Sequence, residues 1–153
     1  RRRIGARLFG EAEARAHLDR FRVLRTLGVG GMGVVYAAED ATLGRVVALK
    51  VIRDDGSGRD DERARILREA RALARLSHPN VVQLHEVVAA PEAVFLVMEY
   101  IAGTTLLQWL RAGPRDLAAI LAVFAAAGRG LAAAHRADIV HRDIKPSNIL
   151  VTR

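Results

Sequence analysis

The sequence predicts an α+β protein, in which a five-stranded antiparallel sheet with one helix is followed by a helical part. Three observations support this fold class. Residues 21–98 contain five segments rich in β-branched and aromatic residues, which favour strands. Residues 60–76 repeat apolar side chains with the period of a helix. After residue 103 the apolar residues again have a helical period, and each such segment follows a Thr or Asp that can cap a helix.

Composition excludes several classes of protein. The 153 residues suffice for one domain that buries most of its apolar surface. With no cysteine, a disulfide framework and a Cys-ligated zinc site are excluded. The net charge of +7 raises the alternative of a nucleic-acid partner, but no aromatic residues are interleaved with the arginines as a stacking platform. We expect a solvated basic surface and no nucleic-acid partner. The longest uncharged apolar run, 117–128, is too short to span a bilayer, so no membrane segment is expected.

The use of lysine singles out two positions. Among 24 basic residues the only lysines are Lys50 and Lys145. Everywhere else the sequence uses arginine, whose planar fork suits generic salt bridges and surface charge. These two positions therefore indicate a need for a compact point charge instead of a planar fork.

A glycine-rich segment joins the first two predicted strands. Gly28, Gly30 and Gly33 have the spacing G-x-G-x-x-G. Val34-Val35-Tyr36 then favour a strand, whereas a dinucleotide-binding loop would open a helix. The Gly-Lys-Ser/Thr ending of a P-loop is absent. The pattern predicts a hairpin whose bare backbone amides can lie over phosphates. An ordinary glycine-rich hairpin turn is the alternative.

The third strand is predicted over residues 46–52. Alternation with a period of two places Ala48 and Lys50 on one face, and Val47, Leu49 and Val51 on the other. The small Ala48 leaves room for a flat ligand, and Lys50 can reach the phosphates of that ligand. A solvated strand lysine is the alternative.

The helix predicted over residues 60–76 contains an acidic residue in its apolar stripe. Glu69 shares that side with Ile66, Leu73 and Leu76. An unpaired buried carboxylate is costly, so we expect a cation to meet it, and Lys50 is the candidate. Alternatively, Glu69 lies at the edge of the stripe and reaches water.

The remaining elements follow in order. Strands are predicted over residues 81–88 and 93–98, and residues 99–103 read as a connector in which Gly103 permits a hinge. Thr104 or Thr105 can cap a short helix that ends before Gly113-Pro114. A longer helix starts at Asp116, and one of its faces is formed by Leu117, Ile120, Leu121, Phe124, Leu131 and His135. His135 is interpreted as a packed histidine at the helix end and not as a ligand.

The segment His141 to Asn148 carries the most distinctive chemistry. Asp143, Lys145 and Asn148 are spaced i, i+2 and i+5, so they cannot share one helix face, and Pro146 breaks a helix there. In a loop their side chains can converge. Such a trio suits phosphoryl transfer, because a carboxylate accepts the hydroxyl proton, an ammonium meets phosphate charge and a carboxamide holds a divalent metal. A polar turn between two strands is the alternative.

Taken together, these motifs resemble the eukaryotic-type (Hanks-type) Ser/Thr protein kinases, and Gly-Gly-Met-Gly-Val-Val-Tyr at 30–36 is similar to the bacterial branch. The resemblance runs from about residue 21 to the last residue. It implies a protein-kinase fold: an N-lobe sheet with one regulatory helix over 21–98, a hinge over 99–103 and a partial helical C-lobe over 104–153. Residues 1–20 are then a leader segment.

The resemblance also implies nucleotide contacts in the N-lobe. The whole glycine loop would contact ATP, through Leu27, Gly28, Val29, Gly30, Gly31, Met32, Gly33, Val34 and Val35. Ala48 would lie against the adenine ring. Lys50 would hold the α- and β-phosphates of ATP and pair with Glu69.

Further implied contacts lie at the hinge and beyond it. Met98 resembles the gatekeeper residue, with the Glu99 carbonyl and the Ile101 amide binding the edge of adenine. Leu150 would support adenine from the other lobe. Lys50 and Asp143 would then face each other across one ATP-sized cleft.

For the catalytic loop, the resemblance implies that Asp143 is the catalytic base, Lys145 acts at the γ-phosphate and Asn148 is a Mg²⁺ ligand. The implied activity is transfer of the γ-phosphate of ATP to Ser/Thr hydroxyls of proteins in the cytoplasm, with any membrane tether in parts not present in this sequence.

The sequence departs from the family at its end. It stops at Arg153, before the Asp-Phe-Gly metal motif, the activation segment and the substrate-binding helices. We therefore expect a fragment with little or no kinase activity by itself, which exposes one face of the helix 117–135. Two alternatives remain: a non-catalytic nucleotide-binding scaffold, and a small-molecule phosphotransferase of the antibiotic-kinase type. The latter usually lacks Lys145 and this glycine loop.

Overall fold

The computed structural model describes residues 20–30, 33–53, 60–90 and 93–152. Gly31, Met32 and nearly all of the predicted leader lie outside the described residues. The chain forms two compact units, and each is described by itself. The first holds the chain up to Ala74 together with Leu84–Tyr100, and the second holds Arg75–Gln83 and the chain from Ile101 onward.

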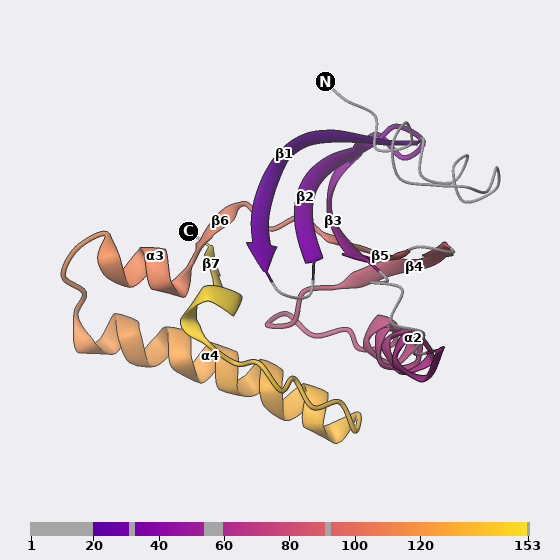
Figure 1. The fold of residues 1–153 in the computed structure, drawn as a ribbon. Coiled ribbons are helices and arrows are strands. Elements are labelled where there is room, and N and C mark those ends of the chain that lie inside the picture. The colour runs from indigo at the N-terminus through magenta and orange to yellow at the C-terminus, as the bar shows by residue number, and fades with distance from the viewer. Residues whose placement is uncertain (1–19, 31–32, 54–59, 91–92, 153) are drawn as a thin grey trace. The chain divides into compact units, whose positions relative to one another are not determined.

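The first unit is built on a five-stranded antiparallel sheet (Figure 1). Five antiparallel strands were predicted. Their order in the sheet is β1-β2-β3-β5-β4, and the strands are β1 Phe21–Gly30, β2 Gly33–Asp40, β3 Arg45–Arg53, β5 Ala93–Glu99 and β4 Leu84–Ala90. The predicted start of β4 at Val81 is wrong. The backbone N–H of Val81 donates to the His78 carbonyl at 3.0 Å, so a turn occupies this stretch and the strand begins three residues later.

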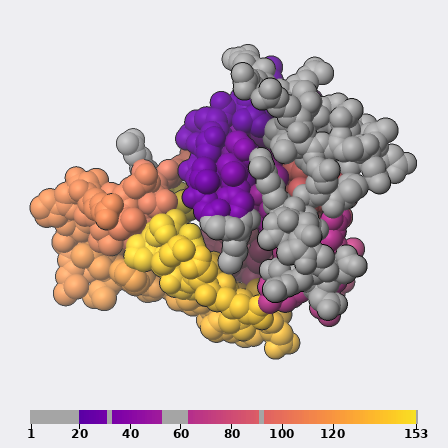
Figure 2. Space-filling view, viewed as in Figure 1, coloured from indigo at the N-terminus to yellow at the C-terminus, as the bar shows by residue number. Residues whose placement is uncertain are grey.

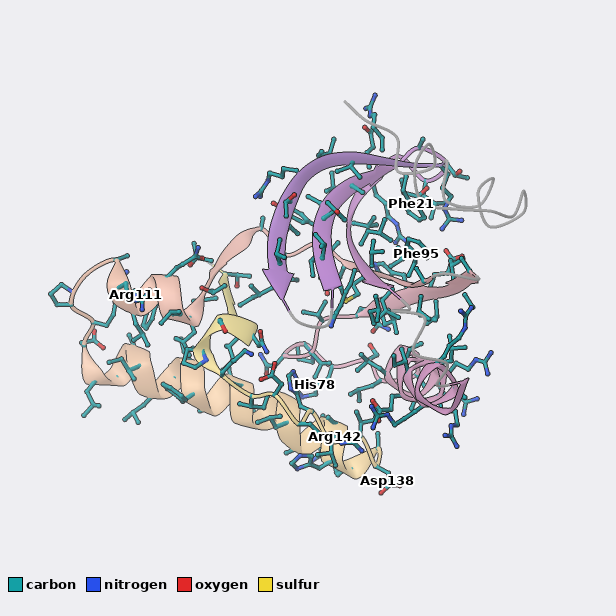
Figure 3. All side chains as sticks on the ribbon, in the orientation of Figure 1. Phe21, His78, Phe95, Arg111, Asp138 and Arg142 are labelled. Atoms are coloured by element: carbon teal, nitrogen blue, oxygen red, sulfur yellow. The ribbon has the colours of Figure 1, made fainter. Side chains whose placement is uncertain are left out.

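The core of this unit lies on one face of the sheet. In the β3–β5 ladder Leu49 pairs with Val97 and Val51 with Phe95, and all four side chains are buried. Phe21, from the start of β1, joins the same cluster, and Figure 3 shows it near Phe95. Ala48 and Lys50 lie on the opposite face, as the alternation predicts.

Ion pairs and a turn close the end of the sheet where β1 begins and β2 ends. Asp40 is fully buried, and its Oδ1 accepts hydrogen bonds from the backbone N–H groups of Thr42 and Leu43. The guanidinium of Arg20 lies 3.8 Å from Asp40 and also pairs with Glu86 of β4. Three strands are thereby joined at one end of the sheet.

Helix α2, Asp60–Ala74, packs against β4 and β5 (Figure 1). Ala70 is the most buried described side chain of this helix, at 5% exposure. The guanidinium of Arg63 donates to the carbonyl of Ala90 at 2.5 Å, which fixes the helix to the end of β4.

The second unit contains two helices, a short ladder and the loop between them. The elements are β6 Gly103–Thr105, α3 Leu106–Arg111, α4 Leu117–Arg136, the 3₁₀ turn η2 Pro146–Asn148 and β7 Leu150–Thr152. The strands β6 and β7 pair antiparallel, which the sequence did not predict. A Cβ on Gly103 would lie 2.5 Å from the carbonyl oxygen of Val151, so this glycine, predicted as a hinge residue, lies in a strand and permits close approach of β7.

Both helix starts of this unit match the predicted caps. Thr105 and Gln108 form a reciprocal capping box at α3: the Thr105 hydroxyl accepts from the Gln108 N–H, and the Gln108 side chain accepts from the Thr105 N–H. The carboxylate of Asp116 accepts from the backbone N–H of Ala119 at 2.6 Å and caps α4.

Helix α4 leaves much of its apolar stripe exposed, in keeping with the expectation that one face of this helix is uncovered. Its buried residues are Gly130, Ala133 and Ala134, whereas Leu117 and Leu121 are 69% and 58% exposed. At 100° per residue the predicted stripe is centred about 130° away from Gly130. Small residues pack because they allow close approach of neighbouring backbone. The interpretation of His135 as a packed histidine is therefore wrong, because it lies on the exposed side.

By length and composition alone, the 20-residue helix α4 is also apolar enough to cross a membrane. This test is weak evidence, because the core helix of a soluble domain passes it as well. Arg129 interrupts the apolar sequence, and the Gly130 side of the helix packs inside the second unit.

Candidate active site

The loop between α4 and β7 brings the three predicted side chains together. The ammonium of Lys145 lies 2.8 Å from Oδ2 of Asp143. The Asn148 amide donates to the same carboxylate oxygen at 3.0 Å and to the Asp143 backbone carbonyl at 2.9 Å. A carboxylate, an ammonium and a carboxamide therefore converge at spacings i, i+2 and i+5, as the sequence predicts for a loop.

Backbone geometry explains why the loop can converge. Arg142 adopts a left-handed conformation with φ of 61°, which costs a non-glycine residue about 1–2 kcal/mol. It turns the chain so that the Asp143 N–H donates to the His141 carbonyl at 2.9 Å. On the other side, Pro146 starts η2, and the Asn148 N–H donates to the Lys145 carbonyl at 2.9 Å. Strain at a loop that gathers reactive groups is typical of functional sites.

Neighbouring elements of the second unit hold this loop in place. The backbone N–H of Leu106, the first residue of α3, donates to the Ile149 carbonyl at 2.8 Å. Leu106 is itself fully buried. Directly after Ile149, β7 pairs with β6. The loop is thus tied to a helix and a ladder immediately after Asn148, while the loop itself stays at the surface, in the yellow segment of Figure 2.

The charge of Asp143 follows from its partners. The hydrogen bond from Lys145 lowers the pKa of Asp143 below its usual value of 3.8, and the Asn148 hydrogen bond and the Lys145 charge act in the same direction. Partial desolvation opposes them but does not reverse the shift. The carboxylate is therefore ionised and able to accept a proton throughout the neutral pH range.

In the first unit, the glycine hairpin joins β1 to β2. Gly28 pairs with Val35, Val29 with Val34 and Gly30 with Gly33. Gly33 has a φ of 126°, and a Cβ there would lie 2.0 Å from the carbonyl oxygen of Val51, so its backbone requires glycine. A Cβ on Gly28 or Gly30 would meet nothing described within 4 Å. These two glycines are therefore not required by packing against the described residues.

Sheet register places the other predicted nucleotide contacts in two adjacent rows. Val35 pairs with Lys50, so Gly28, Val35 and Lys50 follow one another across β1, β2 and β3. Two residues along, Ala48 pairs with Met98 of β5. Paired residues of an antiparallel ladder point to the same side. The amine of Lys50 and the small side chain of Ala48 are therefore presented on the side away from the buried core.

The structure does not bury Glu69. This residue is exposed, whereas Ala70, one position along the helix, is buried. The step of 100° between the two places Glu69 at the edge of the apolar face, which is the alternative noted from the sequence. The expectation of a buried carboxylate inside the stripe is thus wrong, and a pair with the half-buried Lys50 stays a prediction.

The predicted hinge residues lie at the end of β5. Met98 is half-buried and Glu99, the last residue of the strand, is exposed. The next residue, Tyr100, accepts a hydrogen bond from the guanidinium of Arg25 at 2.8 Å, a contact with β1 that the sequence gave no signal for. Ile101 and Leu150 belong to the second unit. That Lys50 and Asp143 face each other across one cleft stays a prediction.

Comparison with known proteins decides the family. The family model described as protein kinase domain matches residues 21–153. This chain belongs to the protein kinase family. The resemblance inferred from the motifs is therefore confirmed, and so is the kinase-like α+β fold.

The kinase domain is similar to bacterial serine/threonine-protein kinases. It is 40% identical over 133 residues to PrkC of Bacillus subtilis. This alignment covers 86% of this chain and 20% of PrkC. It is 43% identical over 133 residues to PknD of Mycobacterium tuberculosis, with the same coverage. The chain spans about a fifth of the length of these curated relatives.

A solved structure agrees with this assignment. The crystal structure of the PknI kinase domain of Mycobacterium tuberculosis superposes with a TM-score of 0.76 at 29% identity. The match covers 87% of this chain and 55% of that chain. The kinase elements described above therefore correspond to about half of the PknI kinase domain.

The chemistry of the catalytic loop fits a magnesium ion only in part. Because the Asn148 amide nitrogen donates to Asp143, its oxygen is left as a ligand of the hard type that Mg²⁺ prefers. Among the described residues, no group of three or more His, Cys, Asp or Glu could hold a metal. These residues of the kinase domain thus fit an ion whose remaining ligands come from elsewhere, such as substrate phosphates and water.

Proposed function

We propose that this chain is the N-terminal part of the catalytic domain of a protein serine/threonine kinase. In this proposal the whole protein transfers the γ-phosphate of ATP, bound with Mg²⁺, to Ser or Thr hydroxyls of proteins. The observation that carries it is the convergence of Asp143, Lys145 and Asn148 on one loop. The similarity to bacterial kinases that are named for Ser/Thr specificity supports the substrate class. In this proposal the kinase domain acts in the cytoplasm, where ATP is available.

In the mechanism, Asp143 acts as the proton acceptor. Its ionised carboxylate takes the proton of the substrate hydroxyl as the hydroxyl oxygen forms its bond to the γ-phosphorus, and the bond from that phosphorus to the bridging oxygen of ADP breaks. Lys145 is 2.8 Å from this carboxylate and stabilises negative charge on the phosphoryl group while it is transferred. The Asn148 oxygen would be one ligand of a bound magnesium ion, which would supply positive charge to offset that of the phosphates.

On the N-lobe side, the glycine hairpin and Lys50 bind the nucleotide. The amides of Gly28 and Gly30 lie over the phosphates, and Lys50 binds the α- and β-phosphates. Val35 and Ala48 contact the adenine ring. The open space at Gly28 and Gly30 and the register that aligns Gly28, Val35 and Lys50 support this assignment.

The proposal is tested by replacing the acceptor in the full-length parent protein. Asp143→Asn keeps the size of the side chain but removes the base, so we expect phosphorylation to fall about 10²- to 10⁴-fold. Binding of ATP, measured by titration calorimetry, should stay within about threefold, since the asparagine still accepts from Lys145. Equal activity of the variant would remove Asp143 from the role of base.

Substrate class is tested with radiolabelled ATP. The parent protein is offered a generic basic protein in one reaction and aminoglycosides in another. We expect label in the protein. Label in the aminoglycoside alone would favour a small-molecule phosphotransferase, and nucleotide binding without any transfer would favour a non-catalytic scaffold.

A further inference from the structure

Arg25 of β1 makes a contact that the proposed mechanism does not use. Its guanidinium donates a hydrogen bond to the hydroxyl of Tyr100 at 2.8 Å. Both residues belong to the first unit, and Tyr100, which directly follows β5, is the last residue of that unit. Another arginine of β1, Arg22, pairs instead with the carboxylate of Glu39 on the adjacent strand β2. Arg25 thus reaches a part of the sheet that is much farther from its own strand.

The contact spans most of the width of the sheet. The order β1-β2-β3-β5-β4 places two strands, β2 and β3, between Arg25 and the end of β5. Three spacings between neighbouring strands amount to roughly 14 Å in a flat sheet. The curvature of β1, β2 and β3, which Figure 1 shows, shortens this path. Both long side chains must therefore extend across one face of the sheet to meet.

Sheet register identifies this face. Arg25 pairs with Ala37 of β2, which pairs with Ala48 of β3. Paired residues of an antiparallel ladder point to the same side, so Arg25 lies on the side of Ala48, away from the core cluster. Tyr100 comes two residues after the β5 partner of Ala48, whereas Lys50 pairs with an earlier residue of β5. The contact therefore crosses this face next to Ala48, on the side away from Lys50.

Strand β1 is held less firmly than the inner strands. It is the edge strand of the sheet, and among the described strands it pairs only with β2. Its register with β2 shifts twice, between Val23 and Arg25 and again between Thr26 and Gly28. Bulges of this kind interrupt the ladder and re-aim side chains, and they are common beside active sites. Arg25 lies between the two shifts, so its side chain supplies a restraint where the ladder is interrupted, shortly before the glycine hairpin.

We propose that Arg25 and Tyr100 are positioning residues: their hydrogen bond holds β1, and with it the glycine hairpin, over the base of the bound nucleotide, and thereby slows nucleotide release. The proposal rests on the proposed function, in which Ala48 contacts adenine and Lys50 binds the phosphates. In that arrangement the Arg25–Tyr100 contact lies at the end of the nucleotide opposite its phosphates. Neither side chain takes part in the transfer itself.

Hydrogen exchange in the full-length protein tests the restraint without any catalysis. Tyr100→Phe keeps the ring and removes only the hydroxyl that accepts from Arg25. We expect the amides of residues 24–30 to exchange about two- to tenfold faster, the factor that one hydrogen bond produces. The matched control is Tyr36→Phe, since Tyr36 is the other tyrosine of the chain and packs against the core cluster on the opposite face. Unchanged exchange in Tyr100→Phe, or an equal increase in both variants, would overturn the proposal.

A double-mutant cycle shows whether the two side chains act through each other. Arg25→Ala removes the donor from the side of β1 and leaves the end of β5 unaltered, which covers the case in which Tyr100→Phe disturbs that end. We expect Arg25→Ala to accelerate exchange of residues 24–30 by a similar factor, and the double variant to exchange no faster than either single variant. Effects that multiply in the double variant would mean that the two side chains act separately, and the proposal would fail.

Nucleotide kinetics measure the consequence for the site. In Tyr100→Phe, ADP carrying a fluorescent label on its ribose should dissociate about two- to tenfold faster, and the KM for ATP should rise by a similar factor. The kcat should not fall, because the catalytic loop is unaltered. Tyr36→Phe should leave dissociation and KM unchanged. Unchanged dissociation in Tyr100→Phe, or a fall in kcat at constant KM, would overturn the positioning role. If the unaltered protein bound no ADP, the proposed function would fail, and hydrogen exchange would still decide whether the contact restrains β1.

Discussion

At the scale of single residues, the site depends on an ion pair at the surface. Asp143 and Lys145 are both well exposed, so their pairing adds little to stability. In the proposed mechanism, the pair matters for the protonation state of Asp143, because a neighbouring ammonium favours the charged carboxylate. The use of lysine at position 145, in a chain whose only other lysine is Lys50, agrees with that local role.

Removing the ammonium should therefore raise the pKa of Asp143. In Lys145→Ala we expect it to move up toward 3.8, since the largest cause of the downward shift is lost. A lowered pKa in the folded state means that the pair stabilises the protein above the unfolded value and that this contribution disappears as the pH falls through the folded value. Carbon NMR of the Asp143 carboxyl between pH 2 and 6 measures the change, with Lys50→Ala as the control that should leave it alone. An unchanged Asp143 titration in Lys145→Ala would contradict the assignment of the cause.

The glycine hairpin offers a second residue-scale prediction. Gly33→Ala should lower the free energy of unfolding by about 1–3 kcal/mol, because it combines a strained φ with a backbone overlap at Val51. Gly28→Ala should change it by less than about 0.5 kcal/mol, since the added methyl group meets open space. Urea denaturation of both variants measures the difference. Equal destabilisation would mean that Gly28 is also held by packing.

At the scale of elements, capping chemistry decides where the helices of the second unit begin. The sequence allowed either Thr104 or Thr105 as the cap of α3. The capping box with Gln108 selects Thr105, and Thr104 is paired in β6 instead. A local motif and a long-range ladder therefore agree on the same boundary.

This agreement predicts unequal effects at the two threonines. Thr105→Ala should destabilise the domain by about 1 kcal/mol, the usual cost of a lost N-cap. Thr104→Ala should cost less than about 0.5 kcal/mol, since Thr104 is exposed and keeps its backbone pairing. Thermal unfolding by calorimetry measures both. A larger loss for Thr104→Ala would reverse the assignment of the cap.

At the scale of the whole molecule, the chain presents apolar surface on α4. Leu117, Leu121 and Phe124 are about half exposed or more, which is unusual for neighbours on one helix face. The match to PknI covers 55% of that kinase domain. A kinase site assembled from both halves of such a domain would be incomplete in these residues alone.

We therefore expect the 153-residue chain by itself to transfer phosphate at least about 100-fold more slowly than its full-length parent, because positioning of phosphates and metal needs groups beyond Asn148. Purified chain and parent are compared with the same basic protein and the same ATP concentration. Circular dichroism of the isolated chain serves as the control for folding. Transfer at ordinary rates by a folded chain would show that these residues suffice.

Much of this architecture follows from local sequence patterns. Alternation over residues 46–52 determines which side of β3 is buried, because successive side chains of a strand point to opposite faces. The caps at Thr105 and Asp116 are decided within three residues, so local reading suffices. The spacing of Asp143, Lys145 and Asn148, with Pro146 between them, already requires a loop.

Tertiary structure alone decided the rest. Periodicity identifies an amphipathic helix but not the neighbour it packs against, and α4 buries its glycine and alanine side because backbone from residue 80 approaches there. The exposed position of Glu69 and the pairing of β6 with β7 are likewise set by partners distant in sequence. The sequence by itself therefore determined the family and the composition of the loop at 141–148, because both follow from residues that are close together in the sequence. Which faces are buried depended on long-range packing, whose free energy no local pattern contains.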